Sequence, residues 1–183
     1  MVAVDMGFLI LLFGERGSPD DRARVDYLVS TLEKSGRNII IPSPALAEYL
    51  VGARKATSQI AEMLWRRNVF RVCAFDERAA IECSILMRGA RDAGDKRRGS
   101  AKDWQVVKFD YQIVAIARVN NARTLYSNDG PLRSFAASAG LQALSLADLQ
   151  LPPEAAQGVL QLQRHPDEDS QAPNAAPSDP KSE

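Results

Sequence analysis

Four acidic residues occupy positions that suit a metal site: Asp5, Glu48, Asp110 and Asp129. Hard cations such as Mg²⁺ and Mn²⁺ prefer carboxylate and water oxygens, and clustered carboxylates repel one another unless such an ion is present. An ion held in this way can lower the pKa of a bound water and neutralise charge that builds on a phosphate group. We therefore interpret the four acids as candidate ligands of Mg²⁺ or Mn²⁺, and phosphodiester hydrolysis as the candidate chemistry.

Asp110 has the most informative setting, because the residues three, four and seven positions after it are apolar: Ile113, Val114 and Ala117. On a helix these positions share a face with Asp110, and a carboxylate on an apolar face needs a cation, a metal or a proton. An ion pair with a nearby Lys or Arg is the simpler alternative.

The other three acids also have simpler interpretations. Glu48 lies in the otherwise apolar segment PALAEYLV and could face solvent. Asp5 and Asp129 each precede an expected helix, where an Asp commonly accepts the free backbone N–H groups of the first turn. Taken together, the four acids fit the set of oxygen donors that Mg²⁺ or Mn²⁺ prefers.

Apolar runs and helical periodicities alternate along the chain. Short apolar runs predict strands at residues 1–4, 38–41, 69–75, 124–127 and 141–146. Helical spacing predicts helices at residues 8–13, 22–34, 44–51, 57–67, 76–87, 103–120 and 132–139, with a charged surface loop at 88–100. This alternation predicts a three-layer α/β/α sandwich with a mostly parallel central sheet, in which Asp5 and Asp129 follow strands and lie near the ligand-binding crevice.

Composition excludes several other classes of function. The formal net charge is zero, so any contact with a polyanion must come from local basic clusters. The single histidine, His165, lies in a polar Pro-rich segment, and Cys73 and Cys83 form no CxxC pair. Ser-His and Cys-His catalysis and a Cys/His zinc site are therefore excluded from the expected folded body.

The expected domain spans residues 1–150. Residues 151–183 are rich in Pro, Ala, Ser and Asp and too poor in apolar residues to offset the entropy lost on ordering, so we expect them to form a disordered tail. Residues 7–13 are apolar, but an acid stands where a signal peptide carries positive charge, and no run is long enough to cross a membrane. We expect a cytoplasmic protein.

Four segments of this sequence resemble the acidic motifs of the PIN-domain nucleases, notably the VapC toxins: VAVD, PALAEYL, KFDYQIVAIA and TLYSND. The resemblance covers about residues 1–149. It implies a PIN-like α/β/α fold, metal-dependent cleavage of single-stranded or structured RNA, frequent homodimerisation and a cognate antitoxin. By position, Asp5, Glu48, Asp110 and Asp129 correspond to the metal-site acids of the family, and Ser127 corresponds to a Ser or Thr that orients that site.

One position departs from the family pattern. Many relatives carry a further Asp two residues after the fourth acid, where this chain has Pro131, so one or two metal ions remain possible. Asn128 is either a substitute ligand or a turn residue. Pro131 also motivates an alternative function, a catalytically silent PIN-like module that binds nucleic acid or protein. A third alternative is a phosphotransfer or phosphatase domain, since these also use an Asp at a strand end, but the Asp-x-Asp motif of aspartyl phosphatases is absent because Gly7 stands two residues after Asp5.

Basic residues near Asp110 are candidate phosphate contacts that would position RNA without reading its sequence. These are Lys96, Arg97, Arg98, Lys102 and Lys108, and a solvated charged loop is the alternative. Trp104 could stack on an unpaired base, but at the start of a helix it is expected to pack against the protein.

Overall fold

The computed structural model describes residues 1–14, 17–53, 57–95, 97 and 103–153. Five strands form one sheet: β1 (Val2–Val4), β2 (Ile39–Pro42), β3 (Phe70–Cys73), β4 (Thr124–Tyr126) and β5 (Gln142–Leu144). The helices are α1 (Met6–Phe13), α2 (Pro19–Lys34), α3 (Ser43–Ala53), α4 (Thr57–Arg66), α5 (Glu77–Asp92), α6 (Trp104–Val119) and α7 (Gly130–Ser138), followed by the 3₁₀ turn η2 (Leu146–Asp148).

All neighbouring strands are parallel, in the order β3-β2-β1-β4-β5. The sheet therefore grows from β1 in two directions, through β2 and β3 on one side and through β4 and β5 on the other. The point between β1 and β4 is the topological switch, and open α/β sheets bind ligands at the carboxyl ends of the strands there. The predicted α/β class with a mostly parallel sheet is confirmed.

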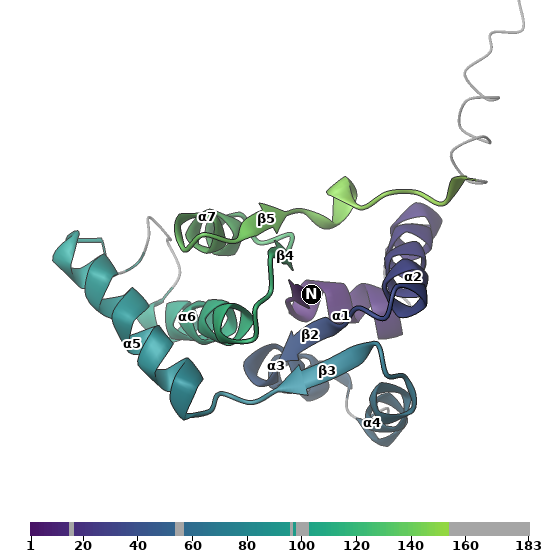
Figure 1. Ribbon diagram of the computed structural model, residues 1–183, viewed down its shortest axis with the longest axis horizontal. Coiled ribbons are helices and arrows are strands. Elements are labelled where there is room, and N and C mark those ends of the chain that lie inside the picture. The colour runs from purple at the N-terminus through teal and green to yellow at the C-terminus, as the bar shows by residue number, and fades with distance from the viewer. Residues whose placement is uncertain (15–16, 54–56, 96, 98–102, 154–183) are drawn as a thin grey trace, which may run out of the picture. The chain divides into compact units, whose positions relative to one another are not determined.

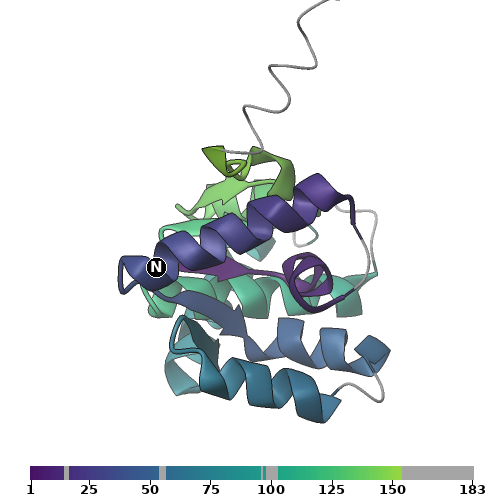
Figure 2. The ribbon, with the colours of Figure 1, turned by 90° about the vertical axis from the view of Figure 1, so that its right-hand side faces the viewer.

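Helices cover both faces of the sheet, as Figures 1 and 2 show. On β1, Ala3 joins the apolar cluster with α5, α6 and α7, whereas Val2 and Val4 join the cluster with α1 and α2. This alternation follows from the two-residue period of a strand. Because both faces are buried, β1 and β2 are apolar throughout, and in β2 the side chains of Ile39, Ile40 and Ile41 are all inaccessible to solvent.

Two of the element boundaries that differ from those expected are informative. The expected loop at 88–100 begins too early, because α5 continues to Asp92. Gly89 weakens a helix locally, but Ala90 is fully buried in the cluster with α6, so packing outweighs propensity. The helix expected at 22–34 begins at Pro19, because Ser18 caps it and exchanges hydrogen bonds with Asp21 in a capping box.

The compact unit runs from Met1 to Leu151. The tail predicted for residues 151–183 lies almost wholly outside the described residues. Within the described part of the chain, no helix combines the length and hydropathy needed to cross a bilayer.

Candidate metal and catalytic site

The carboxyl ends of β1 and β4 lie side by side at the topological switch. Val4 is in register with Tyr126, and the backbone N–H of Asp5 donates to the Tyr126 carbonyl at 3.3 Å. The N–H of Ser127 continues the ladder to the Leu144 carbonyl of β5 at 3.0 Å. The sheet itself therefore brings Asp5 and the loop after β4 together, although 122 residues separate Asp5 from Ser127.

Asp5 is a buried carboxylate, with 8% of its surface exposed. One oxygen, Oδ1, accepts the N–H of Phe8 at 3.1 Å and so caps α1, and the other, Oδ2, accepts a short hydrogen bond from the Ser127 hydroxyl. The capping role considered from the sequence is thus real, and it uses one of the two oxygens. Burial raises the pKa of Asp5, opposed by hydrogen bonds from Ser127, Phe8 and Gly7, and the charge of Asp129 raises it further.

Ser127 links the two acids. It is fully buried, and its Oγ donates to Asp5 while accepting the backbone N–H of Asp129 at 2.9 Å. Asp129 caps α7 by accepting the Leu132 N–H at 3.1 Å. Asp5, Ser127 and Asp129 form a hydrogen-bonded group at the switch, which we call the carboxylate site.

Two contacts that the sequence did not reveal hold the loop of the carboxylate site. The Arg133 guanidinium donates to the Ser127 carbonyl at 2.8 Å, and the side-chain oxygen of Asn128 accepts the Leu146 N–H at 3.0 Å. Asn128 therefore has a structural role that ties this loop to η2. Its oxygen is already engaged by the backbone, which favours the turn role over the ligand role considered from the sequence.

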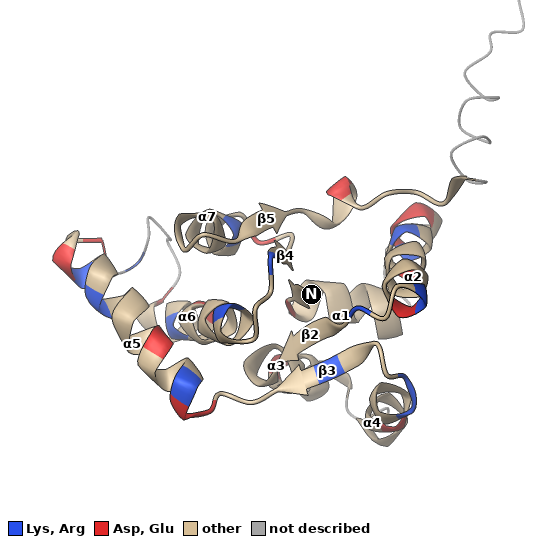
Figure 3. Ribbon diagram, in the orientation of Figure 1, with Lys and Arg blue, Asp and Glu red and all other residues tan. Residues whose placement is uncertain are grey.

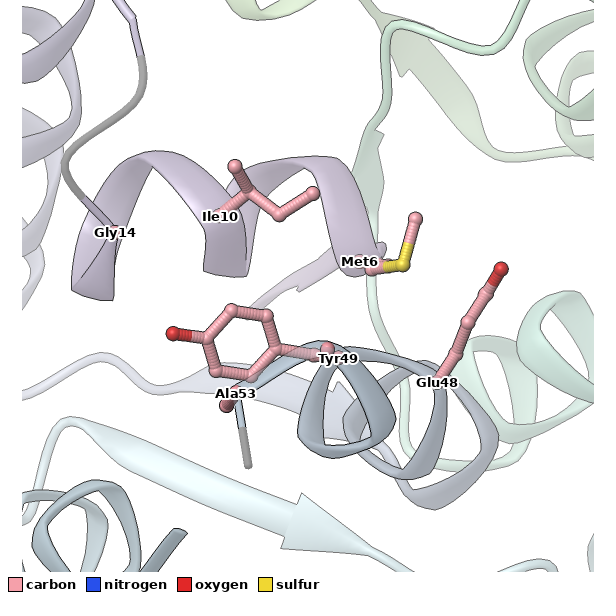
Figure 4. A pocket seen from close by; sticks show the side chains of 7 residues that line it. Met6, Ile10, Gly14, Glu48, Tyr49 and Ala53 are labelled. Atoms are coloured by element: carbon pink, nitrogen blue, oxygen red, sulfur yellow. The ribbon is translucent and has the colours of Figure 1, made fainter. Parts of the chain in front are cut away.

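Glu48 and Asp110 lie on α3 and α6, two helices that pack against each other. Asp110 is half-buried, and Ile113, Val114 and Ala117 on its expected apolar face are buried in the core. Glu48 is exposed, and it lines a cavity of about 570 Å³ between α1 and α3. In Figure 4 its side chain lies beside Met6 at one end of that cavity.

The structure thus links two of the four acids, Asp5 and Asp129, through Ser127, and places the other two on adjoining helices. Among the residues that the structure describes, no three acidic, Cys or His side chains gather closely enough to form a ready metal cluster. The donor set of the carboxylate site is nevertheless entirely oxygen, which suits Mg²⁺ or Mn²⁺. A buried acid with a raised pKa beside a second acid is also the setting that a divalent cation would relieve.

Gly7 contributes open space next to Asp5. A Cβ built on Gly7 would stand 3.2 Å from Oδ1 of Asp5 and 3.7 Å from Oδ2. A side chain here would crowd the carboxylate, so glycine keeps this approach to Asp5 clear. The sequence signal was only that Gly7 weakens an otherwise strong apolar helix.

The predicted phosphate contacts are only partly described. Lys96, Arg98 and Lys102 lie outside the described residues, and Arg97 is exposed. Lys108, on α6, donates to Gln105 at 3.2 Å and lies 5.6 Å from the centre of the Trp104 ring. Basic and acidic residues are interleaved on α2 and α5 (Figure 3), in keeping with the net charge of zero.

No protein-family model and no curated protein matches this sequence. Two solved structures match its fold. A chain of VapBC2 from Rickettsia felis, bound to a DNA fragment from its promoter, superposes with a TM-score of 0.56 at 16% identity, covering 79% of this chain and 98% of that chain. A chain of DNA-bound VapBC from Salmonella typhimurium gives 0.52 at 18%, covering 80% and 99%.

This chain has a PIN-domain fold. The PIN fold confirms the architecture that the four acidic motifs implied, and nearly the whole of each matched VapBC chain is covered. The carboxylate site lies at the topological switch of this fold, where the carboxyl ends of β1 and β4 lie side by side.

Proposed function

We propose that this protein is a metal-dependent endoribonuclease that hydrolyses phosphodiester bonds of single-stranded or structured RNA, and that it is the toxin of a toxin-antitoxin pair. The observation that carries the proposal is the carboxylate site: a buried Asp5 with a raised pKa, hydrogen-bonded through Ser127 to the loop of Asp129, at the switch point of a PIN fold. A buried, perturbed acid in such a crevice is typical of a functional site.

Asp5, Asp110 and Asp129 would hold Mg²⁺ or Mn²⁺, with Glu48 approaching from α3. The bound ion would supply an activated water and neutralise charge on the scissile phosphate. Ser127 fixes the carboxylate of Asp5 by hydrogen bonding, and the surrounding protein buries most of the Asp5 side chain. Gly7 leaves the approach to that carboxylate open.

The proposed protein partner is a cognate antitoxin. Both matched structures are VapBC complexes. In this chain the cavity between α1 and α3 is lined by the apolar side chains of Met6, Ile10 and Tyr49 and has Glu48 at one end. An apolar inhibitor segment seated there would lie next to a proposed metal ligand. The predicted homodimer and cytoplasmic location belong to the same proposal.

The decisive experiment is RNA cleavage by the purified full chain. We expect cleavage of single-stranded RNA in Mg²⁺ or Mn²⁺, loss of cleavage in EDTA, and at least a hundredfold lower rate in Asp110→Asn, since charge stabilisation of this kind supplies a few kcal/mol. Asp26→Asn, on the exposed face of α2, is the matched control and should keep full activity. Cleavage that survives EDTA, or that is unchanged in Asp110→Asn, would refute the proposal.

The second candidate is a silent PIN-like module that binds nucleic acid or protein without turnover. Two observations favour it: Pro131 stands where many relatives carry an acid, and the described residues hold no ready three-ligand cluster. Calorimetric titration with Mn²⁺ separates the two candidates. RNA binding without any Mn²⁺ binding would select the module, whereas Mn²⁺ binding that is lost in Asp5→Asn would select the nuclease.

A further inference from the structure

A second cavity, of about 500 Å³, lies between α5 and the beginning of α6. It is lined by Ser84, Met87, Arg88, Arg91 and Trp104. The four residues from α5 stand at helical spacing, so they share one face of that helix, and Trp104 is the first residue of α6. The cavity is of a size that accommodates a small ligand.

The lining combines the groups that single-stranded nucleic acid requires. Arg88 and Arg91 are exposed and one helical turn apart, and guanidinium groups bind phosphate oxygens through two parallel hydrogen bonds. Trp104 is an aromatic platform of the kind on which bases stack. Its ring is held edge-on by Tyr111 at 6.1 Å between centroids, and Lys108 adds a positive charge 5.6 Å from its centre.

The cavity also lies toward the carboxyl edge of the sheet, the edge that carries the carboxylate site. Because α6 leads into the amino end of β4, its own beginning lies toward the carboxyl edge, where Asp5 and Asp129 stand. Trp104 precedes Asp110 by six residues, or about 9 Å along the helix axis. A stacked strand advances about 3.4 Å per nucleotide, so about three nucleotides span this distance.

We propose that this cavity is a nucleotide subsite for the RNA strand: Trp104 stacks on a base, and Arg88 and Arg91 bind the adjoining phosphates. The subsite rests on the proposed ribonuclease function and extends it to residues a few nucleotides from the scissile bond. Trp104, for which the sequence allowed base stacking but favoured packing against the protein, then has both roles, because its ring contacts Tyr111 and also lines the cavity.

The two tryptophans make a direct test possible. Trp65 on α4 is 82% exposed and does not line the cavity. In the full chain carrying Trp65→Phe, Trp104 is the single tryptophan reporter. Titration with a short single-stranded oligouridylate in EDTA, where no cleavage takes place, should quench its fluorescence. Trp104→Ala in the otherwise native chain should weaken binding of the same oligonucleotide, followed by anisotropy, about tenfold, whereas Trp104→Phe should keep most of the affinity and Trp65→Ala all of it.

A second variant keeps the test valid if Trp104→Ala folds poorly. The double change Arg88→Ala and Arg91→Ala alters exposed helical positions. It should lower the slope of log affinity against log salt by about 1.4, because each phosphate contact to a single strand contributes about 0.7. The charge-matched control is Arg37→Ala with Arg123→Ala, at exposed positions just before β2 and β4 and hence at the opposite edge of the sheet. This control should leave the slope unchanged.

The outcomes separate the subsite from the proposed function. If RNA is cleaved in Mg²⁺ but oligouridylate affinity is the same in Trp104→Ala and in the double arginine variant, the subsite is wrong and the ribonuclease stands. If Trp104 is quenched and both variants bind weakly, yet no RNA is cleaved, the subsite stands and the ribonuclease fails. Unchanged RNA affinity together with lost self-association on gel filtration would overturn the subsite in favour of a protein interface.

Discussion

Ser127→Ala tests the central link of the carboxylate site. The hydroxyl of Ser127 is fully buried and takes part in two hydrogen bonds, one to the carboxylate of Asp5 and one from the N–H of Asp129. A hydrogen bond to a charged group contributes about 1.5 to 3 kcal/mol, and one from a backbone N–H about 0.5 to 1.5 kcal/mol. We expect the free energy of unfolding to fall by about 2 to 4 kcal/mol.

The assay is urea unfolding at neutral pH in EDTA, supported by thermal unfolding, where a loss of this size lowers Tm by roughly 5 to 15 °C in a chain of this length. The matched control is Ser138→Ala on α7, which removes an exposed hydroxyl that donates to the Phe135 carbonyl at 2.7 Å. That change should stay within about 0.5 kcal/mol. Ser127→Thr keeps the hydroxyl and should recover part of the loss.

A double-mutant cycle identifies the partner. In an Asp5→Asn background the Ser127→Ala change should cost less, by an interaction energy of about 0.5 to 3 kcal/mol, because the charged acceptor is already gone. The reasoning is refuted if Ser127→Ala costs under 1 kcal/mol in the native background, or if its cost is the same in both backgrounds.

Two further predictions concern Asp5 and its neighbour. Because burial raises the folded-state pKa of Asp5, the native state holds this proton more tightly than the unfolded state. The contribution of Asp5 to metal-free stability is therefore greatest below the ordinary Asp value of about 3.9 and falls as pH rises through the folded pKa. Asp5→Asn should therefore be more stable than the native chain in EDTA at neutral pH, and equal Tm values from about pH 4 to 8 would contradict this. Gly7→Ala should weaken Mn²⁺ binding and should not stabilise the protein, since the added Cβ would crowd Asp5. The control is Gly89→Ala on α5, where a Cβ meets nothing within 4 Å, and this change should raise the free energy of unfolding by about 0.5 to 1 kcal/mol. Equal stabilisation by the two changes in urea unfolding would count against the crowding of Asp5.

Much of the fold was predictable because its strands are short, apolar and separated by helical periodicity. The run at Ile39–Ile41 is buried on both faces, as expected for a central parallel strand. The end of α5 was not predictable, because Gly89 and the charges around it resemble a loop until the burial of Ala90 against α6 is known. The start of α2 could have been predicted from the sequence, because Ser18 and Asp21 have the spacing of a capping box.

The part of the candidate site that lies at the ends of strands could be predicted from the sequence. Asp5 and Ser127 follow strands, and parallel strands align their carboxyl ends, so their proximity follows from topology. The Arg133 and Asn128 contacts could not be predicted, because each joins a side chain to a backbone group whose position depends on how the loops pack. Whether Glu48 and Asp110 complete a metal site stays a prediction for the experiments above.

The pairing of β1 with β4 also determines when the carboxylate site comes into existence. The bond between Asp5 and Ser127 joins residues 122 positions apart, and non-local parallel pairing is slow to form. During synthesis, the segment carrying Asp5 emerges long before the segment carrying Ser127 and Asp129 is made. The site therefore cannot assemble on a nascent chain until both segments are free of the ribosome, so a truncated product that stops short of β4 would lack it entirely.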